Sequence, residues 1–326
     1  MPACTASTRA KDPVGPLLPT LLPDTSGLES EAMGIKDSNV AIVVGIDDVP
    51  DNADSLTWAV AEAEATGRPL RLVHAFEWLA EQAPYYAPVK NEHPDAGIRA
   101  EFTQRAHEIA HHATEFVNAL DANVSMSSRV IEGTPSTVLT EEGRDAAMLV
   151  LGSHARGLAG RLLMGSVSSA VAADPPCPVT VVRNGIVHPV DDPTLPIVVG
   201  VDRSPSSRAA LRFAADHAAA HKSHLIIVHS WHHYPRRTAG TVAEQADHRD
   251  EWVRGVIDAV HQEHPSLDIT RAVTETGPKL SLVDWSERAR LVVVGTSEHH
   301  KHLGSVAQAL LHHAWSPVTV VPSTSE

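Results

Sequence analysis

The sequence is poor in cysteine, in positive charge and in long apolar runs, and each shortage excludes a class of protein. Only Cys4 and Cys177 occur in 326 residues, which implies no disulfide framework and favours a reducing compartment, so we expect a cytoplasmic protein. Lysine and arginine number 26 against 40 aspartates and glutamates, and the net charge of −14 repels the phosphate backbone of nucleic acid. No apolar stretch approaches the length of a membrane span. Neither nucleic acid nor a membrane is therefore an expected partner.

What the chain does contain is an internal repeat. The segment AIVVGID at 41–47 returns as PIVVGVD at 196–202, and an offset of 155 residues, from Asp47 to Asp202, keeps later positions in step. The copies also end alike, with CPVTVV and SPVTVV. A repeat of this length is a whole domain rather than a solenoid unit. We therefore expect a disordered, proline-rich leader (1–38), a first domain (39–183), a linker (184–195) and a second domain (196–322).

Within each copy, short β-branched runs alternate with helical patterns. The first copy predicts strands at 42–46, 70–76, 124–131, 148–151 and 179–182, and helices following Asp54 and over 98–120, 135–144 and 162–172. The second copy repeats this order. The order βαβαβαβαβ predicts an α/β fold with two tandem Rossmann-like, doubly wound domains. Each would have a five-stranded parallel sheet with helices on both faces.

Candidate binding residues follow strands one and four, which flank the point where the chain order of such a sheet reverses. Asp47 ends strand one and could accept hydrogen bonds from a ribose or a base, although an aspartate at this place is also a common helix cap or turn residue. Strand four leads into a glycine-rich loop from Gly152 to Gly165 and Ser166. Glycines let backbone amides approach phosphate oxygens, and a helix that opens at Ser166 favours an anion.

These residues carry a resemblance to the universal stress protein family, which covers residues 40–183 and 195–322. The family pattern is glycine, two residues, glycine, nine residues, then glycine followed by serine or threonine. Gly152, Gly165 and Ser166 fall on this pattern, and Ala155 stands at the second glycine. A Cβ is unwelcome where backbone approaches a ligand, so Ala155 departs from the pattern at a place that matters for affinity.

The resemblance implies a strand order of 3-2-1-4-5 and ATP as the ligand, with Mg²⁺ as a possible companion. It implies that Asp47 meets the adenine or the ribose and that the backbone of Ala75 meets the base. It also implies that Gly152, Gly165 and Ser166 hold the phosphates, with Ala155 in the same loop. No separate metal site is expected, because solvated side chains are the favoured interpretation of the 21 histidines.

The second copy departs further from the pattern. Only nine positions separate Gly295 from Gly304, which leaves the loop four residues shorter than in the first copy, and Glu298 stands at the second glycine. A carboxylate there would face a phosphate. We therefore expect one adenine nucleotide in the first domain, and a second domain that keeps the fold for assembly or for modulating its neighbour.

The final strand of each domain, at 179–182 and 318–321, would lie exposed at a sheet edge, and an apolar edge must be covered or paired. The duplication allows the two halves to pair within one chain, and a homodimer is a further possibility.

The loop lacks the lysine of a P-loop and a base to activate water, so at most weak ATP hydrolysis is expected. The predicted function is that of an ATP-binding regulatory protein of the stress response. The alternatives are a scaffold that binds no nucleotide and an adenylate-forming or ATP-pyrophosphatase-like enzyme.

Overall fold

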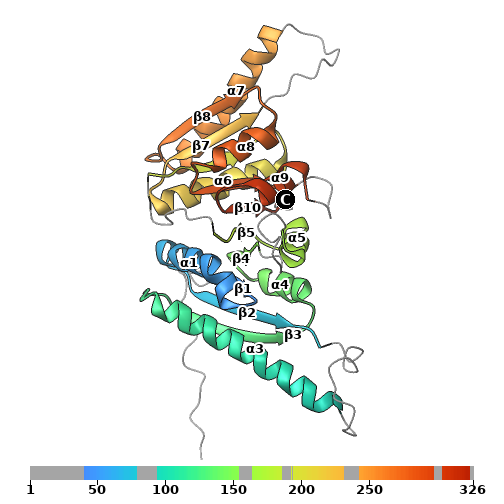
Figure 1. Ribbon diagram of the computed structural model, residues 1–326. Coiled ribbons are helices and arrows are strands. Elements are labelled where there is room, and N and C mark those ends of the chain that lie inside the picture. Colours follow the sequence, from blue (N-terminus) through green and yellow to red (C-terminus); the bar gives the residue numbers. More distant parts are fainter. Residues whose placement is uncertain are drawn as a thin grey trace, which may run out of the picture. The chain divides into compact units, whose positions relative to one another are not determined.

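The structure is a computed structural model that describes residues 40–78, 94–153, 164–185, 192, 194–230, 242–296 and 303–323, with the backbone alone for 94–98 and 242–250 (Figure 1). All of the described residues belong to one compact unit. The predicted leader, 1–38, lies outside the described residues.

The first copy folds as alternating strands and helices. They are β1 (Ile42–Ile46), α1 (Val49–Thr66), β2 (Leu70–Phe76), α3 (Pro94–Ala119), β3 (Met126–Glu132), α4 (Pro135–Gly143), β4 (Met148–Gly152), α5 (Ser166–Ala173) and β5 (Val179–Val182). The second copy repeats the order. Its elements are β6 (Ile197–Gly200), α6 (Pro205–His221), β7 (Leu225–Ser230), α7 (Val242–Glu263), β8 (Ile269–Thr274), α8 (Pro278–Ser286), β9 (Leu291–Gly295), α9 (Ser305–His313) and β10 (Val318–Val321).

The strands form one sheet in the order β3-β2-β1-β4-β5-β10-β9-β6-β7-β8. Within each copy the neighbours are parallel, and the first five strands stand in the order 3-2-1-4-5, which confirms the predicted fold class. Among the strands that the structure describes, β5 and β10 are the antiparallel pair, with Thr180 opposite Thr319. The strands left at the two edges of the described sheet are β3 and β8.

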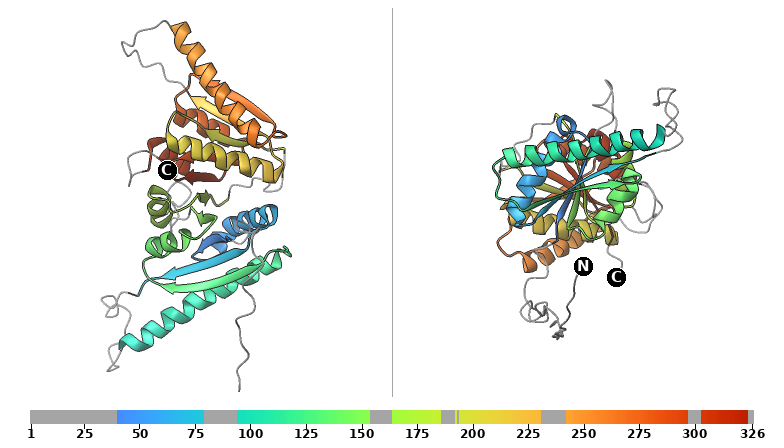
Figure 2. Two further views of the ribbon diagram at one scale, coloured as in Figure 1. Left: turned by 180° about the vertical axis from the view of Figure 1, so that it is seen from behind. Right: turned by 90° about the horizontal axis from the view of Figure 1, so that it is seen from below.

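Helices cover both faces of this sheet (Figure 2). One apolar core collects residues of α1, α3 and α6, among them Leu56, Ala113 and Leu211, and the other collects residues of α4, α5, α8 and α9, among them Leu139 and Leu310. The strands supply both cores because their consecutive side chains point to opposite faces, as Val43 and Val44 do. Strands buried on both faces are typical of a parallel sheet between helices.

The start of helix α1 differs from the prediction. We expected Asp54 to cap this helix, but the helix begins at Val49, with Asp48 as the N-cap residue and Pro50 in the first turn. A proline in the first turn costs no hydrogen bond and has its φ preset for the helix, so the helix extends back to the end of β1. Asp54 therefore lies inside α1.

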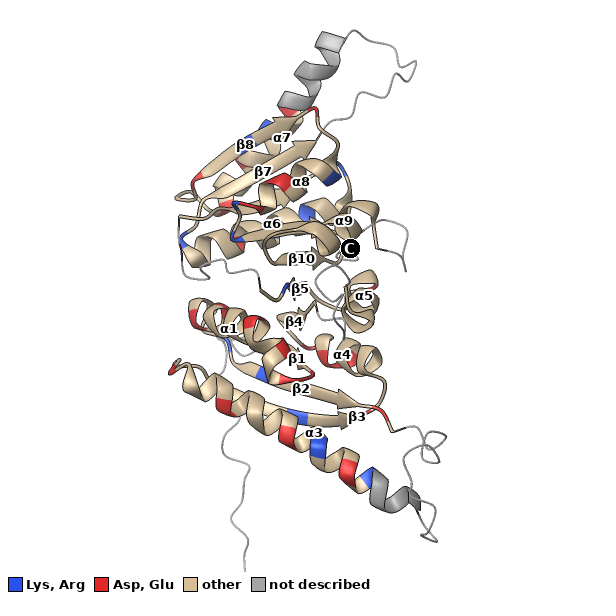
Figure 3. Ribbon diagram, in the orientation of Figure 1, with Lys and Arg blue, Asp and Glu red and all other residues tan. Residues whose placement is uncertain are grey.

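In the described part of the chain, basic side chains are not concentrated on any one element. Lysines and arginines are interspersed with aspartates and glutamates (Figure 3). No helix within the described ranges is long and apolar enough to cross a membrane.

Candidate functional site

The candidate site lies at the carboxyl ends of two neighbouring parallel strands. β1 pairs with β4, with Gly45 opposite Leu151, so both strands end at the same edge of the sheet. Asp47 follows the last residue of β1 and is exposed, and Gly152 is the last residue of β4. The next described helix after β4, α5, begins at Ser166. These are the positions at which ligands bind open α/β sheets.

Asn52, on the first turn of α1, fixes the backbone that carries Asp47. Its side-chain oxygen accepts hydrogen bonds from the backbone amides of Asp47, at 2.8 Å, and Asp48, at 3.2 Å. Its amide nitrogen donates to Ser55 Oγ at 3.3 Å, and both side chains are buried. Because a buried polar network with partners resists rearrangement, the turn after β1 is held in one conformation.

Gly152 lies against this network. A Cβ at position 152 would stand 3.0 Å from Asn52 Nδ2, tighter than an ordinary van der Waals contact. Its carbonyl oxygen accepts a 2.7 Å hydrogen bond from Ser168 Oγ of α5. Residues of α1 and α5 therefore converge on the end of β4, and glycine allows α1 its close approach.

The amino terminus of α5 presents backbone amides without a capping side chain. Gly165 is the N-cap residue and has no side chain to accept from the amides that follow it, while Ser166 is exposed. Gly165 has a φ of −62° and a ψ of 146°, which any residue can adopt, so the backbone conformation does not require glycine at this position. The first amides of a helix and its dipole favour an anion such as a phosphate group.

Ala75 lies on β2, opposite Ile131 of β3, and is half-buried. The preceding residue, His74, is buried, and its Nδ1 lies 2.8 Å from the carbonyl oxygen of Ile46. A carbonyl oxygen can only accept, so Nδ1 carries the hydrogen of this bond. The structure thus brings together the carboxyl ends of β1, β2 and β4 and the start of α5, whereas Ala155 lies outside the described residues.

The corresponding turn of the second copy is built differently. One carboxylate oxygen of Asp202 accepts from the backbone amide of Ser204, at 2.8 Å, and from the hydroxyl of the same serine. Ser207, at the repeat position of Asn52, donates to the carbonyl oxygen of Asp202 at 2.6 Å. Asp202 is therefore engaged in a local turn of the kind that aspartate forms with the residue two positions later.

Gly295, at the end of β9, is enclosed by α6. A Cβ there would lie 2.6 Å from the backbone carbon and oxygen of Ser206, whose hydroxyl donates to the carbonyl oxygen of Thr296 at 2.7 Å. Packing against a helix backbone is thus a sufficient reason for this glycine. Glu298, the charged residue of the shortened loop, lies outside the described residues.

Three residues that support the site were not predicted from the sequence: Asn52, Ser55 and Ser168. A usable signal was present for Asn52, because the 155-residue offset carries it onto Ser207 and both copies therefore place a polar residue five positions after the strand-one aspartate. A group outside this site was not predicted either: Glu62 of the first copy contacts His217 and His221 of the second. The expectation that the histidines are solvated is wrong for His217 and His74, which are buried.

Comparison with known proteins places these observations in a family. The mycobacterial protein named Universal stress protein Rv2005c, from Mycobacterium tuberculosis, is 31% identical over 295 residues, which cover 86% of this chain and 96% of the relative. Universal stress protein Rv1996 of the same species is 27% identical over 312 residues, or 88% of this chain and 96% of the relative.

Among solved structures, a universal stress protein from Archaeoglobus fulgidus superposes with a TM-score of 0.64 at 17% identity, covering 87% of this chain and 98% of that one. This likeness concerns the fold. Two segments of the chain, 40–183 and 194–322, match the universal stress protein family. The chain therefore belongs to the universal stress protein family and carries two copies of its domain in tandem.

Proposed function

We propose that this protein binds one adenine nucleotide, ATP, in its first domain and acts as a regulatory protein of the stress response in the cytoplasm. The observation that carries the proposal is the convergence of Asp47, Gly152 and the uncapped start of α5 at one edge of the sheet. Asp47, with the backbone of Ala75, would hold the adenosine part. Gly152, Gly165 and Ser166, with Ala155 in the loop between them, would hold the phosphates.

Three features support a fit between these residues and a nucleotide. Asp47 is exposed, so its carboxylate lies at the surface of the protein. Ser168 of α5 donates to the carbonyl oxygen of Gly152, which fixes the start of α5 beside the end of β4. The first turn of α5 carries no acidic residue, so nothing in that turn repels a phosphate group. Mg²⁺ would accompany ATP as a companion of its phosphates rather than in a protein site of its own.

We propose that the second domain keeps the fold but binds no nucleotide. Asp202 is occupied by its local turn, and the loop between Gly295 and Gly304 is four residues shorter and contains Glu298. We further propose that the two halves of one chain pair with each other in solution through β5 and β10, with a homodimer of chains as a possible higher assembly.

Native mass spectrometry of the protein after purification without added nucleotide tests the proposal. We expect a mass increment of one ATP or its hydrolysis product per chain. A chain that carries nothing and takes up no added ATP would contradict nucleotide binding and favour a scaffold. A bound acyl-adenylate would contradict regulation alone and favour an adenylate-forming enzyme.

A further inference from the structure

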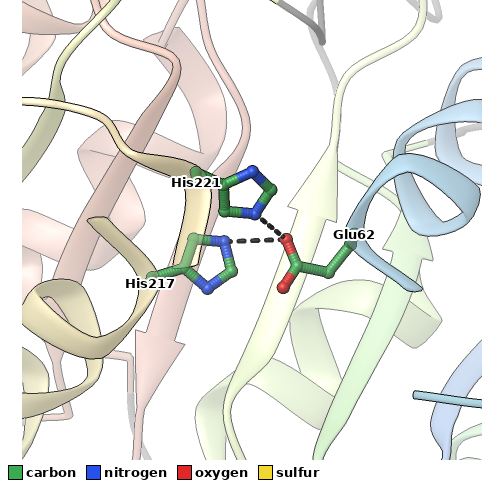
Figure 4. Close-up of side chains that lie close together, drawn as sticks. All are labelled: Glu62, His217 and His221. Atoms are coloured by element: carbon green, nitrogen blue, oxygen red, sulfur yellow. Dashed lines mark hydrogen bonds and ion pairs between the residues drawn. The ribbon is translucent and has the colours of Figure 1, made fainter. Parts of the chain in front are cut away.

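A buried cluster of polar side chains joins the two copies away from the candidate nucleotide site. One carboxylate oxygen of Glu62, on α1, lies 2.9 Å from Nε2 of His217 and 2.7 Å from Nε2 of His221, both on α6 (Figure 4). The side chains are 3%, 6% and 4% exposed. We call these three residues the interdomain cluster. Two imidazole N–H donors thus converge on one desolvated carboxylate.

Glu62 and His217 occupy equivalent positions in the two copies of the repeat. The offset of 155 residues that relates Asp47 to Asp202 carries Glu62 onto His217. One position therefore faces its own counterpart, with an acid in the first copy and a histidine in the second. The duplication would by itself have put identical residues there.

The neighbouring aromatic residues follow the same relation. The ring of His217 stacks against Trp58 of the first copy, at 6.4 Å between centroids and 9° between planes, and against Phe213 of its own helix, at 5.2 Å. The repeat offset carries Trp58 onto Phe213. The imidazole plane is thus held by aromatic rings from both copies, with its Nε2 directed at Glu62.

Arg290 determines which nitrogen of His221 carries hydrogen. Its guanidinium lies 2.8 Å from Nδ1 of His221, and because a guanidinium can only donate, Nδ1 is the acceptor. Nε2 of His221 therefore holds the hydrogen and donates it to Glu62.

The same three side chains would also suit a zinc ion, since two histidines and a glutamate form a known ligand set and their ligand atoms lie within 4.8 Å of one another. Coordination through Nε2 would need the hydrogen on Nδ1, where Arg290 already donates. The hydrogen-bonded arrangement is therefore the one that fits the neighbours of the cluster.

We propose that the interdomain cluster determines which helix surfaces pair. It favours pairing of the α1 face of the first copy with the α6 face of the second copy, and it disfavours pairing of like copies from two chains. Two first copies would bring Glu62 against Glu62, two buried carboxylates without a donor between them. Two second copies would bring imidazoles together without a carboxylate to accept from them. Only the unlike pair satisfies donors and acceptor. This inference concerns assembly and is independent of the proposed nucleotide.

The test is a double-mutant cycle in the full chain, read by urea unfolding in the presence of EDTA and by light scattering. Glu62→His places three histidines together and His217→Glu places two acids together, so each should raise the unfolding equilibrium constant about a hundredfold or convert the chain to a larger assembly. Exchange of the two residues, E62H with H217E, restores one acid and its histidine donors, and should recover at least about half of the summed loss. Glu64→Gln, at an exposed position of the same helix, is the control and should change little.

If the exchanged variant loses as much as the two single variants together, complementarity at this position is not the cause and the proposal fails. It also fails if both single variants match the parent. Should either single variant not fold, Glu62→Gln, which keeps the size of the side chain, replaces it and must still destabilise the protein more than Glu64→Gln does.

A metal site is tested separately. Equimolar Zn²⁺ added without EDTA should leave the unfolding midpoint of the parent unchanged. A rise that His217→Gln abolishes would overturn the proposal in favour of a metal site.

Discussion

Glu62 is a buried acid that contacts two histidines of the other copy. Burial raises the pKa of its carboxyl, but the electrostatic attraction and hydrogen bond of His217 and the hydrogen bond of His221 outweigh burial, and the pKa lies at about 2 instead of 4.5. A carboxyl whose pKa is lowered in the folded state stabilises the protein above its unfolded pKa and loses that contribution as the pH falls to the folded value. The contribution of Glu62 should therefore be complete at neutral pH and disappear between about pH 4.5 and about pH 2.

Glu62→Gln checks this directly. We expect the parent to be more stable than the variant at neutral pH, with a difference that narrows below about pH 4.5 because the carboxyl becomes protonated in the unfolded state. Urea unfolding at a series of pH values measures the difference. Glu64→Gln should follow the parent throughout, and a gap between parent and Glu62→Gln that stays constant with pH would contradict the assigned pKa.

Cys177 illustrates the opposite effect of burial. Desolvation raises the pKa of its thiol to about 12, although a backbone hydrogen bond from Leu149 opposes the rise. Since the thiolate is the reactive form, Cys177 should be inert toward a thiol reagent at neutral pH in the native protein and react fully in urea. The assay uses the Cys4→Ser variant, so that one thiol is counted. Rapid modification of the native protein would contradict this and show that the segment before β5 is accessible.

At the scale of elements, the junction of β5 and β10 offers a pairwise test of register. Thr180 and Thr319 are both fully buried, and their hydroxyl oxygens lie 2.8 Å apart across the antiparallel pair. Replacing one threonine with valine leaves the other hydroxyl without this partner and should cost about 1–3 kcal/mol, whereas replacing both should cost less than about 1 kcal/mol. Denaturant unfolding of the two single variants and the double variant gives the coupling. Additive losses would mean that the two hydroxyls do not meet.

The glycines that end β4 and β9 should respond differently to alanine. In Gly295→Ala the new methyl group would collide with the backbone of Ser206 at 2.6 Å, which we expect to destabilise the chain by about 1–3 kcal/mol. In Gly152→Ala it would meet the side-chain amide of Asn52 at 3.0 Å, so the loss of stability should be smaller. Thermal unfolding compares the two. Equal losses would contradict the view that packing alone requires the glycine in the second copy.

Much of the order of helices and strands along the chain could be predicted from the sequence, because the strands are short β-branched runs and the repeat shows each of them twice. The start of α1 was misplaced because Asp54 looked like a cap, while Pro50 allows the helix to begin earlier. Asn52 was missed because a single polar residue on a helix gives no pattern of its own. Sequence patterns identify the strand ends at a site more readily than the side chains that hold those ends in position.

At the scale of the whole molecule, the duplication has produced a sheet of ten strands from two five-stranded units. The interdomain cluster could not be predicted from either copy alone, since Glu62 and His217 lie far apart in the sequence and meet only where α1 faces α6. The spacing of His217 and His221, four positions apart on one helix, placed them on one face, but nothing in that helix pointed to an acid in the other copy. The interdomain cluster and the glycine-containing loops after β4 and β9 share one property, because in each of them the two copies carry different residues.

Nucleotide binding by the first domain alone can be tested by calorimetric titration of ATP into the parent protein, Gly165→Asp and Gly304→Asp. Both glycines are N-cap residues with φ near −60°, and aspartate is favoured at an N-cap, so both variants should keep their helices. The parent should bind one ATP per chain, Gly304→Asp should bind it equally well, and Gly165→Asp should lose at least about tenfold in affinity because its carboxylate occupies the place of a phosphate. Two ATP molecules per chain in the parent, or an equal loss of affinity in both variants, would contradict the account.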